Sequence, residues 1–215
     1  MNLDLFESQS SHTVKSESLA LPDANVILYR NFFSYEKASE LFRRLRSEIA
    51  WRQEKVNLYG RQHDIPRLSA WYGDNAEVYT YSGLRSVASA WTTTLDEVKK
   101  EVESNIGVGF NSVLANLYRT GADGVSWHSD DEKELGPSPV IASVSLGESR
   151  VFQMKHKTNK NLKYSIPLNS GSLLLMSGAT QHNWLHQIPK TKKLLNERIN
   201  LTFRTIVRPF QDAVH

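Results

Sequence analysis

Cysteine is absent from the sequence: none occurs among its 215 residues. That absence excludes disulfides, thiolate nucleophiles and cysteine-type zinc sites, so any metal must be held by imidazole, carboxylate or other oxygen ligands. The chain also lacks an apolar run long enough to span a bilayer, and its first twenty residues contain no apolar core of signal-peptide length. We therefore expect an intracellular protein without a membrane partner, cytoplasmic in a bacterium and nuclear in a eukaryote.

A strong excess of one charge is missing too. The 26 Lys and Arg residues are nearly balanced by 23 Asp and Glu residues, which leaves a formal charge of +3. A small positive charge suits an anionic partner such as nucleic acid, although proteins with other functions are equally basic. The cluster formed by Lys190, Lys192 and Lys193 fits a solvated face as well as a phosphate contact.

The first part of the chain predicts a tail and two helices. Residues 1–20 are polar and rich in serine, which indicates a flexible tail, and residues 21–215 have the length of a single domain. A short strand at residues 26–29 precedes a helix capped by Ser34, whose apolar residues recur at helical spacing. A second helix is predicted from the capping box Thr94-Leu95-Asp96-Glu97 to a stop at Gly107.

From Phe110 onward, short apolar or alternating segments are separated by Gly, Pro, Asn and Ser. They lie at residues 111–118, 140–146, 150–155, 164–168, 171–176 and 198–207. No alternation of strands and helices typical of a parallel sheet is present. The pattern predicts an α+β protein with a mainly β core, an antiparallel jelly-roll type barrel or sandwich supported by helices from the first half of the chain.

The final segment, RINLTFR, places polar and apolar residues on opposite faces of a strand. Arg198, Asn200, Thr202 and Arg204 share one face at period two, and the residues between them are apolar. Two arginines on one face of a half-buried strand need anionic partners, which a structural ion pair or a dianionic small molecule would supply.

Metal-ligand residue types occur at positions that strands would bring together. His128 and Asp130 point to the same side of an extended segment, and a later histidine, His186 or His182, offers a third ligand. Two imidazoles and one carboxylate on one face of a metal are typical of non-heme Fe(II) oxygenases. Asp131 competes with Asp130 as the carboxylate, but period two favours Asp130.

Several motifs, in chain order, resemble the AlkB family of Fe(II)- and 2-oxoglutarate-dependent dioxygenases, which repair alkylated nucleic acid. They are NLY at 116–118, HSD at 128–130, WxHxIP at 184–189 and RINLTFR at 198–204. Similarity in PRLSAWYGD at 66–74, YTYSGL at 79–84 and IASVSLG at 141–147 extends the resemblance over residues 50–207 and points to the branch of the animal DNA-repair homologues.

The resemblance implies a double-stranded β-helix with its core at about residues 110–207 and a nucleotide-recognition segment at about residues 51–84. It implies that iron is held by His128, Asp130 and His186, with His182 a bystander. The residues implied to bind 2-oxoglutarate are Asn116, Tyr118, Arg198, Thr202 and Arg204, with Arg198 at the distal carboxylate and Arg204 near the chelating end. O2 is the further cosubstrate, and we expect a monomer.

For the substrate, the resemblance implies a flipped base held by pocket aromatics at Tyr72 and Tyr79. Asp131 matches the acid that accepts the exocyclic amino group of adenine or cytosine. A hairpin that enters the duplex corresponds to residues 56–61, where Tyr59 would be the wedge, Gly60 would allow the turn and Arg61 would lie near phosphate. For the neighbouring Trp71, a core role is expected.

The implied reaction is oxidative demethylation of 1-methyladenine and 3-methylcytosine in DNA, which releases formaldehyde, succinate and CO2. The same chemistry on RNA or on a protein side chain is the first alternative. A non-catalytic nucleic-acid-binding module is the second, and it would need neither the iron ligands nor the two arginines.

Overall fold

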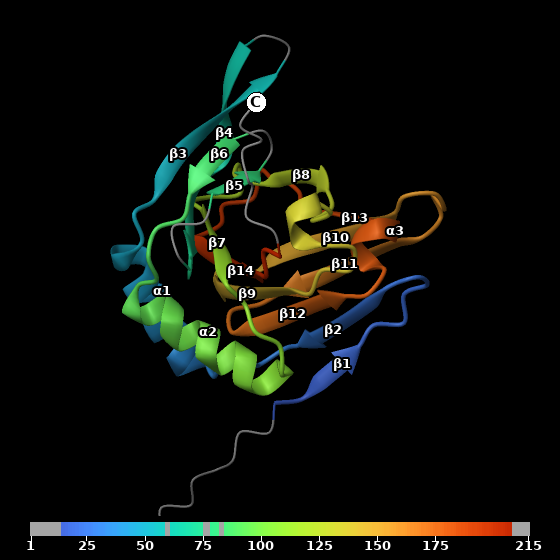
Figure 1. Cartoon of the computed structure of the whole chain (residues 1–215), viewed down its shortest axis with the longest axis horizontal. Coiled ribbons are helices and arrows are strands. Elements are labelled where there is room, and N and C mark those ends of the chain that lie inside the picture. Colours follow the sequence, from blue (N-terminus) through green and yellow to red (C-terminus); the bar gives the residue numbers. More distant parts are fainter. Residues whose placement is uncertain (1–13, 59–60, 75–77, 82–83, 208–215) are drawn as a thin grey trace, which may run out of the picture.

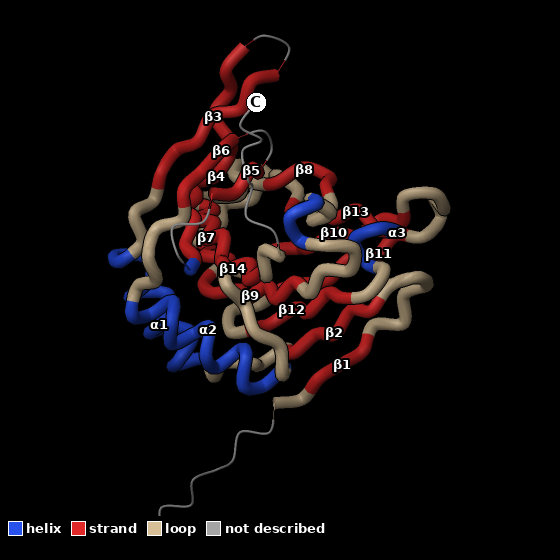
Figure 2. Tube along the Cα trace, viewed as in Figure 1, coloured by secondary structure: helices blue, strands red, loops and turns tan. Residues whose placement is uncertain are grey.

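Two antiparallel sheets form the body of the protein, and the computed structural model describes residues 14–58, 61–74, 78–81 and 84–207 (Figures 1 and 2). The order of the eight-stranded major sheet is β1 (Ser16–Ser18), β2 (Asn25–Tyr29), β12 (Ser172–Ser177), β9 (Ile141–Gly147), β14 (Arg198–Arg204), β7 (Ser112–Tyr118), β4 (Arg61–Gly73) and β3 (Arg52–Leu58). The order of the minor sheet is β11 (Lys163–Leu168), β10 (Arg150–His156), β13 (Trp184–Ile188) and β8 (Val125–His128). A separate hairpin pairs β5 (Val78–Tyr81) with β6 (Leu84–Val87).

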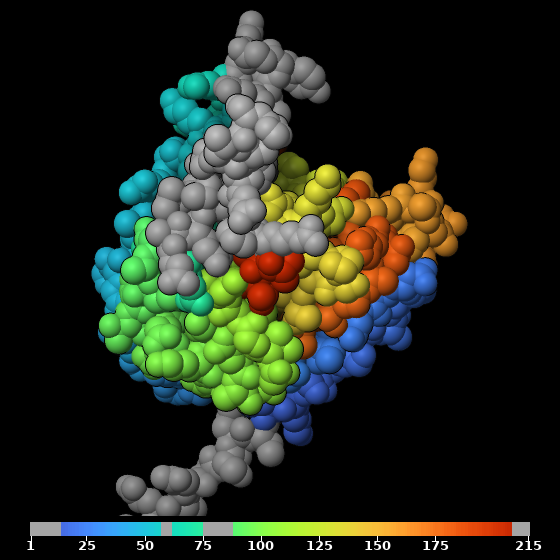
Figure 3. Space-filling view, viewed as in Figure 1, coloured from blue at the N-terminus to red at the C-terminus, as the bar shows by residue number. Residues whose placement is uncertain are grey.

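This architecture confirms the predicted mainly β fold with supporting helices. The two long helices, α1 (Tyr35–Glu48) and α2 (Thr93–Ile106), lie side by side against the outer face of the major sheet (Figure 1). A 3-10 turn (Lys133–Leu135) and a one-turn helix, α3 (Thr180–Asn183), interrupt the second half of the chain, where only strands were expected. Figure 3 shows α2 and its flanking segments in green, packed closely against the yellow and orange segments of the second half.

The two helix starts show how local side chains decide where a helix begins. Ser34 caps α1 as predicted, because its hydroxyl accepts the amide of Lys37 at 3.2 Å. The second prediction was wrong by two residues: Thr92 caps α2, whereas Thr94 donates its hydroxyl to Glu48 on α1 at 2.6 Å. Thr94 therefore joins the two helices instead of starting one.

The predicted boundary of the N-terminal tail also needs correction. Residues 16–18 form β1, which pairs with β2 through Ser16–Tyr29, Glu17–Leu28 and Ser18–Ile27. A strand therefore lies inside the segment 1–20 that was predicted to be a tail, because the edge of the major sheet offers unpaired backbone groups to an extended segment beside it. Residues 1–13 lie outside the described part of the chain.

Two apolar layers form the core, one on each face of the major sheet. Successive side chains of β14 point alternately into one layer and the other. Ile199, Leu201 and Phe203 point into the layer between the major sheet and the helices, and all three are fully buried. The second layer lies between the two sheets and includes Leu114 of β7 and Met154 of β10. The polar residues of β14 face this second layer, so a polar site is surrounded by apolar packing.

None of the helices in the described part of the chain combines the length and the apolarity that crossing a bilayer takes.

Candidate metal and cofactor site

The polar face of β14 lines a pocket between the two sheets. Arg198, Asn200, Thr202 and Arg204 all contribute to its wall, as the period-two pattern predicted. Other polar residues reach the same pocket from β4, β7, β8, β9 and β13: Arg67, Asn116, Tyr118, His128, Ser143 and His186. The apolar remainder of the wall includes Phe152 and Met176.

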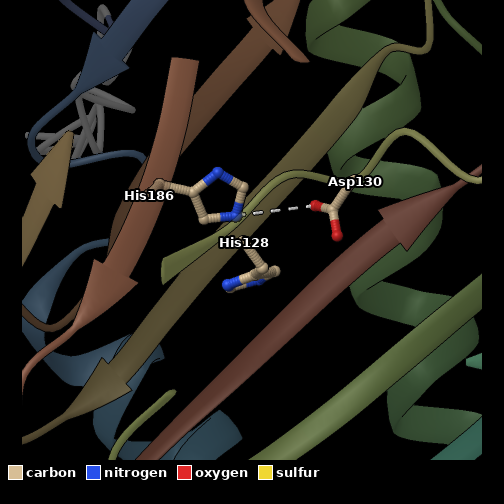
Figure 4. A group of neighbouring side chains, drawn as sticks. All are labelled: His128, Asp130 and His186. Carbon is tan, nitrogen blue, oxygen red and sulfur yellow. Dashed lines mark ion pairs between the residues drawn. The ribbon is translucent and has the colours of Figure 1, made fainter. Parts of the chain in front are cut away.

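At one end of this pocket, His128, Asp130 and His186 converge (Figure 4). His128 is the last residue of β8, and His186 lies opposite it on β13. Asp130 follows β8 in the adjoining loop and is 1% exposed. One ligand atom from each residue lies within 4.8 Å of the others, and Nε2 of His186 is 3.9 Å from Oδ2 of Asp130. The three side chains thus present two imidazoles and a carboxylate to a common point.

The alternative ligands that the sequence offered, His182 and Asp131, do not belong to the converging group. His182 is exposed on α3, where its Nε2 contacts the carbonyl oxygen of Pro137. Asp131 is 47% exposed and is not one of the three converging residues. Of the residues that spacing left open, the structure brings His186 and Asp130 together with His128.

Neighbouring groups hold His128 and Asp130 in place. Nδ1 of His128 lies 2.8 Å from the carbonyl oxygen of Ser126, which leaves Nε2 for a metal. Nη2 of Arg204 donates to Oδ1 of Asp130 at 2.7 Å. The backbone amide of Asp130 donates to Oε1 of Gln181 at 3.0 Å, and Gln181 is fully buried. No sequence motif had singled out Gln181.

Burial keeps both histidines neutral. It lowers the pKa of His186 to about 3, with a further lowering by the charge of His128. Burial also lowers the pKa of His128. For Asp130, burial raises the pKa, but Arg204 and the two histidines together lower it below its usual value. Neutral imidazoles beside an ionised carboxylate are the protonation states that metal binding requires.

The metal-free protein should lose stability as the solution is acidified. An unfolded histidine takes up a proton near pH 6.5, whereas His186 stays neutral in the fold until about pH 3. The unfolded state therefore binds more protons below pH 6.5, so this stabilisation is present above that pH and is lost as the pH falls toward 3. The slope from this residue approaches about 1.4 kcal/mol per pH unit.

Urea unfolding of the metal-free protein from about pH 7 to about pH 5 measures this effect. His186→Gln should give a shallower decline than wild type, because glutamine does not titrate. Equal slopes for the two proteins would contradict the assigned neutral state of His186.

At the other end of the pocket, Arg198 is buried with fewer hydrogen-bond partners than its guanidinium group can use. The residue is 1% exposed, and its Nη2 donates to Oγ of Ser145 at 2.9 Å. Its Nε and Nη1 atoms have no hydrogen-bond partner among the described residues. The guanidinium carbon lies 5.1 Å from the ring centre of Tyr118. An unsatisfied buried cation of this kind is expected to meet an anion that enters the pocket.

Two other predicted cofactor residues, Asn116 and Thr202, line the same pocket, and each is hydrogen-bonded to a further residue of its wall. Oδ1 of Asn116 accepts from Nε of Arg67 at 2.7 Å. Oγ1 of Thr202 donates to Oδ1 of Asn200 at 3.1 Å. Sequence reasoning missed Arg67, because alternation along β4 places it on the same face as Ser69 and Trp71 without saying that this face meets the pocket.

One predicted substrate residue is corrected by the structure. Tyr72 is 4% exposed and belongs to the core layer between the major sheet and the helices, where its hydroxyl accepts the amide of Ala50 at 3.1 Å. It is not among the residues that line the pocket. The next residue back, Trp71, faces the layer between the sheets as a core aromatic, which agrees with the expectation for it.

The hairpin and second-aromatic predictions lie outside the region that the structure describes in detail. Tyr59 and Gly60 are outside the described residues. Arg61 begins β4 and Tyr79 belongs to β5, but their side chains are not described. These residues remain predictions.

Comparisons with known proteins show which proteins the chain is similar to. Residues 25–204 match the family model described as the 2OG-Fe(II) oxygenase superfamily. The human alpha-ketoglutarate-dependent dioxygenase alkB homolog 3 is 41% identical over 192 residues, which covers 85% of this chain and 66% of that protein. The chain thus spans just under two thirds of that relative.

Two further matches are informative. The human DNA oxidative demethylase ALKBH2 is 38% identical over 189 residues, which covers 83% of this chain and 72% of that protein. A solved structure described as that of OsALKBH1 matches with a TM-score of 0.63 at 16% identity, over 89% of this chain and all of that one. At that identity the structural match shows the fold alone.

Proposed function

Because the chain belongs to the 2OG-Fe(II) oxygenase superfamily, we propose that it is an iron- and 2-oxoglutarate-dependent enzyme that demethylates alkylated bases in DNA. The observation that carries this proposal is the convergence of His128, Asp130 and His186 in the same pocket as the under-satisfied Arg198. A metal ligand set beside a buried anion site is what the reaction needs.

The three converging residues fit iron. Two neutral imidazoles and one carboxylate, presented from one side, leave further coordination positions toward the pocket. Arg204 and Gln181 hold Asp130 from two directions, so the carboxylate is oriented before a metal arrives. We assign His128, Asp130 and His186 as the iron ligands.

The arginine end of the pocket fits a dicarboxylate. The free nitrogens of Arg198 would donate to the distal carboxylate of 2-oxoglutarate, with the phenol of Tyr118 beside it. Arg204, next to the iron ligand Asp130, would lie near the chelating end. Asn116 and Thr202 complete the wall between these two arginines.

When bound, iron and 2-oxoglutarate supply the chemistry that converts O2, the cosubstrate and an N-methyl group into CO2, succinate and a hydroxylated carbon that leaves as formaldehyde. The protein's own residues hold the ligands, bury the cosubstrate and exclude water with the apolar wall that includes Phe152 and Met176. Asp131, exposed and one residue after an iron ligand, would accept the exocyclic amino group of a flipped adenine or cytosine.

DNA is the preferred substrate because the 38% identity to a relative named as a DNA oxidative demethylase covers 83% of the chain. RNA remains the alternative, since adenine and cytosine carry the same methyl lesions in both nucleic acids. We further propose that Tyr59, with Gly60 and Arg61, forms a wedge that enters duplex DNA, and that Tyr79 contacts the flipped base.

Matched oligonucleotides that carry one 3-methylcytosine test this proposal. We expect iron-loaded protein with 2-oxoglutarate to restore cytosine in DNA faster than in RNA of the same sequence. Tyr59→Ala should lower the rate on double-stranded DNA more than on single-stranded DNA. Faster repair of RNA would favour the alternative substrate, and an equal loss on both DNA forms would rule out the wedge.

A further inference from the structure

We propose that Lys157 determines which bases the pocket accepts, by holding the carboxylate of Asp131 in one orientation. This inference rests on the proposed function, because it concerns how Asp131 reads a flipped base. Lys157 directly follows β10, in the turn that leads to β11 (Figure 1). No sequence motif had assigned it a role.

Lys157 is held from two sides by elements that border the iron site. Its Nζ donates to Oδ2 of Asp131 at 3.0 Å and to the carbonyl oxygen of Gln181 at 2.9 Å. Its backbone amide donates to the carbonyl oxygen of Asn183 at 2.7 Å. The side chain is 27% exposed, against 47% for Asp131. The ammonium group therefore has a defined position instead of sampling solvent freely.

The hydrogen bonds to Asp131 fall on one of its two oxygens. Oγ of Ser129 donates to Oδ2 at 2.8 Å, and the ammonium group of Lys157 reaches the same atom. Two donors on Oδ2 fix the rotation of the carboxylate about its side-chain bond. Oδ1 is thereby left to accept a further donor, such as an amino group of a base.

The same contacts tie the base-reading acid to the iron ligand beside it. Gln181 accepts Lys157 with its backbone oxygen and accepts the amide of Asp130 with its side chain. The Gln181 side chain is fully buried, so it is a rigid anchor. Asp131 and Asp130 are thus positioned from one residue of α3, which keeps the distance from the base contact to the metal constant.

An oriented acceptor discriminates between bases by their exocyclic groups. Adenine and cytosine present an amino donor, whereas guanine and thymine present a carbonyl acceptor at the equivalent position. A carboxylate oxygen held toward that position favours the donor and repels the carbonyl. Without Lys157 the carboxylate can rotate away, so the discrimination should fall while the iron and 2-oxoglutarate sites stay intact.

The test compares repair of 3-methylcytosine and 3-methylthymine in one oligonucleotide sequence. The measured quantity is the ratio of the two kcat/KM values. Since a base contact of this kind contributes about 1–3 kcal/mol, Lys157→Met should lower the ratio roughly 10-fold or more. The exposed Lys160 lies in the same turn, so Lys160→Met is the matched control and should leave the ratio unchanged. Lys157→Arg, which keeps the positive charge, should retain most of the wild-type ratio.

A second arm checks that Lys157 acts through Asp131. Asp131→Asn should lower the ratio by itself, and adding Lys157→Met to it should change the ratio no further. Iron content and the KM for 2-oxoglutarate should match wild type in every variant. Because exposed ion pairs contribute only about 0–1 kcal/mol, the unfolding midpoint should hardly move.

Two outcomes would overturn the inference while leaving the proposed function in place. One is an unchanged ratio in an active Lys157→Met protein, and the other is an equal loss on both lesions, which would indicate general support or a phosphate contact. Wild-type protein that consumes 2-oxoglutarate but repairs neither lesion would instead overturn the proposed function, and this inference with it.

Discussion

Replacing Asp130 by asparagine is expected to remove iron binding and to lower turnover by more than about 100-fold, since loss of a group that merely supports a metal ligand already costs about 10- to 100-fold. The substitution keeps the size of the side chain but removes the negative charge from a fully buried position between Arg204 and the two histidines. Its amide is also a weaker ligand for iron than a carboxylate.

Asp130→Asn should also destabilise the metal-free protein. The carboxylate accepts from Arg204 at 2.7 Å, and the two side chains are 2% and 3% exposed. Removing one charge from a buried pair costs roughly 3–5 kcal/mol, because the remaining cation loses its compensation. Urea unfolding without metal measures this term separately from iron binding.

The neighbouring acid is the matched control for Asp130. Asp131→Asn alters a carboxylate that is 47% exposed and outside the ligand set, so iron content and stability should stay close to wild type. Anaerobic titration with Fe(II) compares the two variants directly. Wild-type iron affinity in Asp130→Asn, or loss of iron in Asp131→Asn, would contradict the ligand assignment.

Arg198→Met is expected to raise the KM for 2-oxoglutarate on the order of 100-fold, which corresponds to about 3 kcal/mol of lost binding. The same substitution should leave the stability of the cosubstrate-free protein unchanged or slightly higher. Arg198 is fully buried, and two of its nitrogens have no hydrogen-bond partner among the described residues, so its charge is poorly compensated until an anion binds.

Arg150 provides the contrasting variant, because it also lies over the ring of Tyr118, at 5.4 Å. Its guanidinium is satisfied by three backbone carbonyl oxygens, those of Thr120, Asp123 and Pro189. Arg150→Met should therefore lower stability by about 1–3 kcal/mol and change the KM for 2-oxoglutarate little. The opposite pattern for the two arginines would contradict the proposed position of the cosubstrate.

The pocket residues could be predicted from the sequence on strands where polar and apolar residues alternate strictly. On β14 the polar residues from Arg198 to Arg204 face the pocket and Ile199, Leu201 and Phe203 face the helices, as period two requires. On β7, Asn116 and Tyr118 line the pocket for the same reason. A strand with one polar and one apolar face has only one stable orientation in a two-layer core.

Tyr72 shows where this reasoning fails. Alternation states that Trp71 and Tyr72 face opposite sides of β4, but it does not say which one faces the pocket. The pairing of β4 with β7 decides which residue faces the pocket. Trp71 lies opposite the pocket residue Leu114, and Tyr72 lies opposite Val113 of the helix-side layer. Register between distant strands is a tertiary property that a single apolar segment does not encode.

Residues that support the site were missed for a related reason. Gln181 and Lys157 act on the two aspartates from segments some 25 to 50 residues away in sequence. Each is a common polar residue in a turn or a short helix, and neither belongs to a spaced motif. Their roles follow from the approach of α3 and the β10–β11 turn to the loop after β8, which only the fold reveals.

The stoichiometry of one reaction tests the central claim most directly. Protein loaded anaerobically with Fe(II) and 2-oxoglutarate is exposed to O2 with a DNA oligonucleotide that carries 3-methylcytosine, and formaldehyde, succinate and restored cytosine are measured together. Wild type should form all three in equal amounts, and His128→Ala should form none. Succinate without formaldehyde or restored cytosine in wild type, or normal turnover by His128→Ala, would contradict the account.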